Sequence, residues 1–352
     1  MKRDSTISAR AGALARASAG ASRFIFRPYL PSDEGDVLEL HRRVFGAGTT
    51  MAERLTAEHW RWKYTPNKDA GASLLAIEKA SGAVVGFVGG VRVALWHGTL
   101  VDVQAVHTLD HMVDPAYRRG LLKTGMFSLM INRWVETYFG RDKSRLGFGF
   151  PCRANLRIGS HAAQYQKLMD VTCLVQEGLG QSPKPCPSSV GALRKTVPHD
   201  ADELWGRCRH AYPMMVARTA DFLRWRYEQH PEVSYTFAEV RRHGRLDGLA
   251  VLRSGGVADD AVTLMDWLTP PDGELAAPAL LAVCQRFLRR VQQSVLVGWL
   301  PESSPHHGEL CSLGFRPRLG PWVVAARVWD ERLTIEALQD TLILTLGDMD
   351  FL

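Results

Sequence analysis

The spacing of apolar and polar residues divides the chain into short strands and amphipathic helices. Alternating or β-branched runs predict strands, and the first two long ones join at Gly82. In the first half these strands cover 24–26, 73–78, 83–95, 100–113 and 146–150. Helical spacing predicts helices over 33–45, 56–64, 121–138 and 158–168. This order predicts an α+β fold, in which helices flank a mixed, mainly antiparallel sheet.

The second half of the chain repeats the first. The run WRWKY at 60–64 is matched by LRWRY at 223–227, which aligns Trp62 with Trp225. Further pairs then fall into line, namely Gly82 with Gly244, Gly86 with Gly248, Asp110 with Asp266, and 146–151 with 296–301. The repeat predicts two tandem units of one fold. The alternative is that the halves share only a generic α+β pattern.

Composition divides the chain further. We expect a disordered tail over 1–22, a first unit over 23–180, a linker over 181–199, a second unit over 200–330 and an acidic tail over 331–352. The linker is rich in proline, and residues 333–352 contain no Lys or Arg. The tail also carries the apolar run Leu342–Leu344, which is expected to pack against the protein.

Bulk composition is that of a globular protein, with 46% hydrophobic and 23% charged residues among 352. No apolar run reaches eighteen residues, so no membrane span is expected. The six cysteines follow no metal-binding spacing, which favours a reducing, cytoplasmic setting and no metal. The net charge of +6 suits an anionic cofactor and also permits RNA.

One segment carries a recognisable chemistry. The run HMVDPAYRRGLL at 111–122 is a strand followed by a basic glycine loop and a helix. Backbone N–H groups at such a loop and helix start bind phosphate, and Arg118 and Arg119 add charged donors. The alternative is a basic surface turn before an ordinary helix.

The same residues resemble the GNAT (Gcn5-related) N-acetyltransferase superfamily, and in particular its tandem proteins in bacteria. The resemblance rests on Arg-Pro-Tyr at 27–29, WRWKY, the run from Asp110 to Arg118, and Gly-Phe-Pro at 149–151, and it spans about 23–330. The family loop reads Val-x-Pro-x-x-Arg-x-x-Gly-x-Gly/Ala. Counted from Arg118, its glycines fall at Leu121 and Lys123, so that Gly120 stands one place early.

That resemblance implies transfer of an acyl group, usually acetyl, from acyl-coenzyme A to an amine. Backbone groups near Met112 and Val113 would bind the pantetheine arm. The pyrophosphate would be held by Arg118, Arg119, Gly120, Leu121, Leu122 and Lys123. The second unit has no arginine before its helix at 275–291, so it is expected to be degenerate.

Two residues are candidates for proton transfer. Asp110 is the candidate base, directly or through water, and its alternative is a structural carboxylate, which the matching Asp266 favours. His107 and His111 lie nearby, and strand alternation places His111 opposite Asp110. Tyr165 resembles the family tyrosine that protonates the thiolate, with a core tyrosine as its alternative.

The leading hypothesis is therefore an acetyl-coenzyme A-dependent N-acyltransferase with a small-molecule amine or amino sugar as acceptor. A second hypothesis replaces the donor by aminoacyl-tRNA or an acyl carrier protein. A third is a non-catalytic binding protein built from two decayed units.

Overall fold

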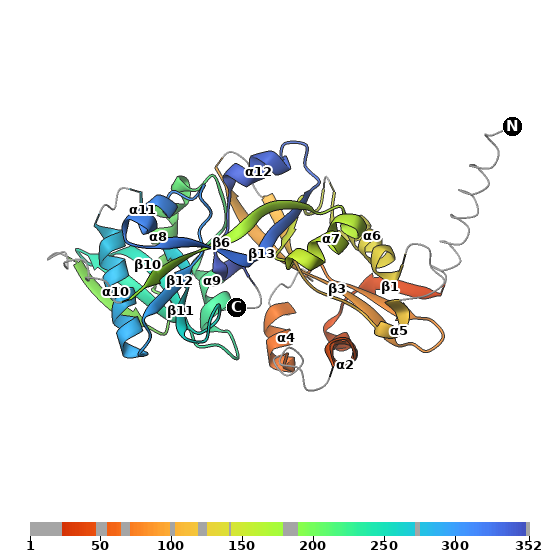
Figure 1. Ribbon diagram of the computed structural model, residues 1–352. Coiled ribbons are helices and arrows are strands. Elements are labelled where there is room, and N and C mark those ends of the chain that lie inside the picture. The colour runs from red at the N-terminus through yellow and green to blue at the C-terminus, as the bar shows by residue number, and fades with distance from the viewer. Residues whose placement is uncertain are drawn as a thin grey trace.

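One continuous sheet runs through both halves of the molecule (Figure 1). The computed structural model describes residues 23–46, 55–64, 71–98, 103–118, 125–140, 142–178, 189–271 and 275–349. The expected tail over 1–22 lies outside these ranges. The predicted α+β class is confirmed.

The first half supplies six strands and five helices to the described part of the chain. The strands are β1 (Phe24–Pro28), β2 (Leu74–Glu78), β3 (Val84–His97), β4 (Val103–Val113), β5 (Leu146–Gly149) and β6 (Gln166–Glu177). The helices are α2 (Glu34–Phe45), α4 (Ala57–Tyr64), α5 (Pro115–Arg118), α6 (Met126–Tyr138) and α7 (Arg153–Ala163). Helices α6 and α7 cover one face of the sheet and α2 and α4 the other (Figure 1).

The second half follows the same plan. Its strands are β7 (Ser189–Arg194), β8 (Met214–Val216), β9 (Thr236–Arg242), β10 (Arg245–Ser254), β11 (Ala261–Leu268), β12 (Val295–Gly298), β13 (Arg316–Val328) and β14 (Leu342–Ile343). Its helices are α8 (Ala201–Cys208), α9 (Ala220–Leu223), a π-helix (Arg224–Glu228), α10 (Ala276–Arg290), α11 (His307–Ser312) and α12 (Ile335–Thr341).

The two halves exchange their last long strands. The sheet order is β1-β2-β3-β4-β5-β13-β6-β12-β11-β10-β9-β7. Strand β13 of the second half pairs antiparallel with β5, and β6 of the first half pairs antiparallel with β12. Each half therefore completes the sheet of the other, and β6 and β13 cross at the centre of the molecule (Figure 1).

The repeat is present in three dimensions. The parallel pair Ala105–Leu146 in the first half has its counterpart in Ala261–Val295. The expected match of 146–151 with 296–301 is therefore wrong by one residue, because Leu146 corresponds to Val295. The end of α7 is held by a hydrogen bond from Arg327 to the Ala163 carbonyl, and the end of α11 by one from Gln176 to the Leu313 carbonyl. These matched contacts exclude the reading in which the halves share only a generic pattern.

Two expected boundaries are wrong. Ser189–Arg194, expected within the linker over 181–199, forms strand β7 and pairs with β9; residues 181–188 lie outside the described part. Residues 333–349 form no loose tail, because α12, β14 and the turn Leu346–Asp348 pack onto the second half, with Leu342, Ile343 and Leu344 fully buried. The apolar run packs because its side chains complete the largest core cluster.

Two expected helices are displaced. The helix expected over 121–138 begins at Met126, because Gly125 before it adopts a φ of 65°. The helix expected over 158–168 spans Arg153–Ala163 and ends where Gln164 turns left-handed. Tyr165 therefore follows the helix instead of lying on it.

Candidate active site

The pairing between β4 and β5 stops part-way along β4. Its described pairs end at His107 with Phe148, while β4 continues to Val113 against β3 alone. The register against β3 shifts beyond Leu109, and Asp110 there has a φ of 49°. This geometry is a β-bulge, which bends β4 away from its neighbour. Beyond Thr108 and Gly149, which still touch, no described pair joins these two parallel strands, and we call this place the gap.

The Tyr165 hydroxyl lies at this gap on the α6 side of the sheet. A Cβ on Gly147 of β5 would stand 2.8 Å from that hydroxyl, so glycine leaves room for it. Burial raises the pKa of Tyr165, opposed by the neighbouring Thr108 hydroxyl. The hydroxyl makes no hydrogen bond of ordinary geometry within the described part of the chain. An unpaired buried hydroxyl is costly, and such a group marks a place where a ligand or water belongs.

The second half has lost this polar feature. Phe315 directly precedes β13 as Tyr165 precedes β6, and Leu296 takes the place of Gly147 in the strand pairing. Both replacements are buried in one apolar cluster. A phenyl ring and a leucine therefore fill the site that a hydroxyl and a glycine leave polar in the first half.

Asp110 lies on the α4 side of the sheet. Its Oδ2 accepts a hydrogen bond from the Lys63 ammonium at 2.9 Å and another from the Tyr64 hydroxyl at 2.7 Å. The Lys63 side chain is only 6% exposed, so the pair is largely shielded from water. These contacts fit a structural carboxylate, and the role of Asp110 as a base stays a prediction.

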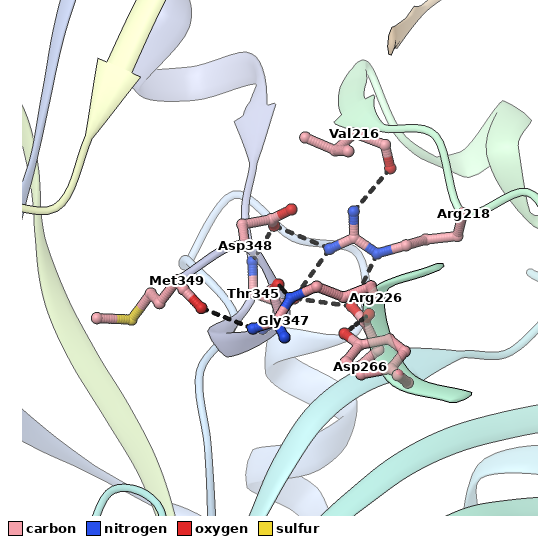
Figure 2. A network of polar contacts seen from close by, with 9 residues as sticks. Val216, Arg218, Arg226, Asp266, Thr345, Gly347, Asp348 and Met349 are labelled. Atoms are coloured by element: carbon pink, nitrogen blue, oxygen red, sulfur yellow. Dashed lines mark hydrogen bonds and ion pairs between the residues drawn. The ribbon is translucent and has the colours of Figure 1, made fainter. Parts of the chain in front are cut away.

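Asp266 sits in a matching but more extensive network (Figure 2). Tyr227 donates to Asp266 as Tyr64 donates to Asp110. The buried Arg218 bridges Asp266 and Asp348, at 2.9 and 2.8 Å. Burial raises the pKa of Asp266, and the Arg218 charge opposes that rise.

The C-terminal segment Thr345–Met349 completes the same network. Thr345 donates its hydroxyl to Asp266 Oδ1 at 2.7 Å. Arg226 donates to the carbonyls of Gly347 and Met349 (Figure 2). The segment is thus fixed to the second half.

The residues expected to bind coenzyme A are only partly described. Met112 and Val113 are buried in β4, and the Val113 carbonyl accepts a hydrogen bond from Arg118 Nε at 2.9 Å. Arg119, Gly120, Leu121, Leu122 and Lys123 lie outside the described residues. Helix α6, which follows these residues in the chain, begins directly after Gly125. Its first turn has no side-chain cap and no acidic residue, which leaves its main-chain N–H groups for an anion.

A narrow pocket opens on the α4 side of the sheet, opposite Tyr165. Its lining includes His107, Leu109 and Phe148, so the pocket lies next to the point where the pairing of β4 with β5 ends. The other lining residues come from both halves and the C-terminal segment: Trp62, Lys63, Val91, Val93, Phe222, Trp225, Arg226, Gly347, Asp348 and Met349. As expected from strand alternation, His111 faces the other way and lies against Phe127 and Trp134 of α6.

Sequence patterns did not reveal Arg218, Thr345 or Asp348 as partners of Asp266. The one local signal is Thr345 with Asp348 three residues later, a capping box that predicts a turn and not its long-range contacts. Among the described residues no three His, Cys, Asp or Glu side chains are placed to hold a metal ion. No helix of the described ranges is long and apolar enough to cross a membrane.

Solved structures share this architecture. A conserved protein of unknown function from Enterococcus faecalis V583, named a probable N-acyltransferase, matches with a TM-score of 0.61 at 11% identity, over 87% of this chain and 72% of that one. A GCN5-related N-acetyltransferase from Kribbella flavida matches with a TM-score of 0.57 at 14% identity, over 87% and 71%. The chain has the fold of the GCN5-related N-acetyltransferases.

The tandem form of the GNAT fold is matched as well. A tandem GNAT protein from the clavulanic acid biosynthesis pathway gives a TM-score of 0.51 at 12% identity, over 87% of this chain and 99% of that one. N-myristoyltransferase from Saccharomyces cerevisiae gives 0.54 at 13% identity, over 88% and 83%. No protein-family model and no curated protein sequence matches the chain. What is shared at these identities is the fold.

Proposed function

We propose that this protein is an N-acyltransferase that moves an acyl group, acetyl in the simplest case, from a coenzyme A thioester to a primary amine. The reaction takes place at the gap between β4 and β5 of the first half. The observation that carries the proposal is the buried Tyr165 hydroxyl at this gap, which makes no hydrogen bond of ordinary geometry to the described residues and which the second half replaces by Phe315. One half is therefore active and the other is a structural partner.

The residues around the gap fit an acyl-coenzyme A donor. The bulge at Asp110 turns β4 away from β5, so main-chain groups beyond it lack a strand partner on that side. Arg118, Arg119 and Lys123 would supply cations near the uncapped start of α6, and an anionic pyrophosphate is stabilised by both. The fit favours coenzyme A over a donor without a pyrophosphate, such as aminoacyl-tRNA.

The donor supplies an activated acyl carbon, and the chain supplies proton transfer. In the reaction an amide C–N bond forms, the thioester C–S bond breaks, the amine loses a proton and the sulfur gains one. The Tyr165 hydroxyl is the donor for the sulfur, because burial raises its pKa and keeps it protonated at neutral pH. Asp110 is the base that the sequence offers, but its contacts with Lys63 and Tyr64 favour the structural role that was its alternative. His107 on the pocket wall is the other candidate.

A thiol-release assay tests the proposal. The protein is incubated with acetyl-coenzyme A and a panel of primary amines, and Tyr165→Phe is compared with wild type. General acid catalysis contributes about 10²–10⁴ in rate, so the variant is expected to lose at least 100-fold in kcat. Tyr138→Phe is the matched control, because Tyr138 is buried in the same cluster but donates to the Ser73 carbonyl.

Retention of full kcat by Tyr165→Phe would make Tyr165 a core residue. Absence of thiol release with every amine, together with absence of acetyl-coenzyme A binding, would remove the proposed function.

A further inference from the structure

We infer that Asp348 of the C-terminal segment binds the acceptor, and that the acceptor is the primary amino group at the end of an unbranched alkyl amine. The use of this pocket in catalysis rests on the proposed function. The binding of the amine itself does not, and the experiment separates the two.

Asp348 is a buried carboxylate with one oxygen unused. Its side chain is 3% exposed, and its Oδ2 accepts hydrogen bonds from Arg218 Nη2 and from the Thr345 main-chain N–H, both at 2.8 Å. The polar contacts of the Asp348 carboxylate with the described residues are all made by Oδ2, which leaves Oδ1 as a further acceptor (Figure 2). Because Asp348 also lines the pocket, we assign this oxygen as the acceptor for a donor that enters there.

The residues that line the pocket determine what kind of carbon skeleton can carry this donor group. Most of the lining is aliphatic or aromatic, from Val91, Val93 and Leu109 on one side to Phe222 and Trp225 on the other. The hydroxyl groups of an amino sugar would find few partners there, and burying them unpaired is costly. An alkyl chain loses nothing by the same transfer.

The size of the pocket also favours an alkyl amine over an amino sugar. Its volume is about 40 Å³, and by this measure one water molecule needs about 10–15 Å³. An amino group and a few methylene carbons match this space, whereas a sugar ring does not. A slender amine therefore fits and its remaining length extends toward solvent.

The charges around the pocket also suit an amine that must become a nucleophile. Lys63 and Arg226 line it together with Asp348, and both are held in place, Lys63 by Asp110 and Arg226 by the carbonyls of Gly347 and Met349. Neighbouring cations favour the neutral form of an amine, while the carboxylate orients its N–H groups. The pocket that Asp348 lines also adjoins His107 at the end of the β4–β5 ladder, so it opens beside the gap.

Calorimetric titration with n-butylamine, in the absence and presence of coenzyme A, tests binding directly. Wild type is expected to bind, and Asp348→Asn to bind at least tenfold more weakly, since a charge-assisted hydrogen bond is lost. Asp340→Asn is the control, because Asp340 is an exposed carboxylate on the neighbouring α12. Val93→Phe fills the pocket without touching the Arg218 network, so it keeps the test valid if Asp348→Asn fails to fold.

The outcomes separate the pocket from the function. Binding of butylamine that Asp348→Asn and Val93→Phe both weaken supports the site even if acetyl-coenzyme A does not bind. In the acylation assay the same variants should raise KM for butylamine at least tenfold and leave KM for acetyl-coenzyme A within twofold. If no amine binds in either condition, or if glucosamine binds more tightly than butylamine, the inference is wrong while the proposed function stands.

Discussion

Trp62 and Trp225 each donate their indole N–H to the main-chain carbonyl of the other, at 2.7 and 3.0 Å. Their rings stack with centroids 5.4 Å apart and planes inclined by 16°. The two residues occupy the same place in the repeat, so a local pseudo-twofold axis passes between them. The two tryptophans that mark the repeat in the sequence therefore also form a contact between the two halves.

Removing either indole N–H should weaken this joint. Trp62→Phe and Trp225→Phe are each expected to lower the free energy of unfolding by about 1–2 kcal/mol, from one lost hydrogen bond and some lost contact area. Because the rings touch, the double variant should lose less than the sum, by about 0.5 kcal/mol or more. Urea unfolding of the four proteins gives these values. Strict additivity would contradict the direct coupling of the two rings.

The ion pair of Lys63 with Asp110 should contribute more to the stability of the fold than to the catalytic rate. Asp110→Asn leaves the nearly buried Lys63 ammonium without its anion and is expected to cost about 2 kcal/mol. At a temperature where the variant stays folded, we expect kcat within tenfold of wild type. A fall of 100-fold or more at unchanged acetyl-coenzyme A affinity would instead assign Asp110 as the base. Thermal unfolding and the thiol-release assay together make the distinction.

His230 should make the protein less stable as the pH falls. Burial, aided by the Arg226 charge and by His59, lowers the pKa of His230 to about 3 from its usual 6.5. The unfolded chain therefore binds a proton that the folded chain refuses, and stability is lost as pH falls from 6.5 toward 3. The loss is up to about 1.4 kcal/mol per pH unit.

The measurement is urea unfolding between pH 7 and pH 5, above the range where carboxylates such as Glu78, whose pKa its Arg23 partner lowers to about 2, begin to contribute. His230→Asn keeps an acceptor for the Val233 N–H but does not titrate, so its slope should be flatter than that of wild type. Equal slopes would mean that His230 is not the group responsible.

Tyr165→Phe should not destabilise the protein. The hydroxyl that it removes makes no hydrogen bond of ordinary geometry to the described residues, so the variant is expected to be as stable as wild type or up to about 1 kcal/mol more stable. Tyr138→Phe should lose about 1 kcal/mol, because it gives up a hydrogen bond to Ser73. A loss from Tyr165→Phe as large as that from Tyr138→Phe would show that the Tyr165 hydroxyl is structurally satisfied.

The sequence predicted the fold well where the signal was local or repeated. Strand and helix periodicity located most elements, and the matched tryptophans located both units. It did not predict that β6 and β13 change places. Alternation identifies a strand but not its neighbour, and the pairing of Gln166–Glu177 with β12 depends on contacts more than a hundred residues away.

The candidate site was predicted in outline. The family-like motifs predicted three parts of the site, namely the strand with Asp110, the basic loop and Tyr165. The loop residues 119–123 lie outside the described ranges. The start of α6 was misplaced because Gly125, with its positive φ, stands directly before the first helical residue, Met126. The contribution of Asp348 was missed, because only the folded chain brings the C-terminal segment to Arg218 and the pocket.

Calorimetric titration with acetyl-coenzyme A is the most direct test of the account, whose central claim is that the gap of the first half binds this donor. Wild type and Arg133→Ala, which removes an exposed arginine from α6, should bind alike, and Arg118→Ala/Arg119→Ala should bind at least tenfold more weakly. At a hundred times its Kd the ligand should also stabilise wild type by about 2.7 kcal/mol. Absence of binding by wild type, or equal binding by the double variant, would contradict the account.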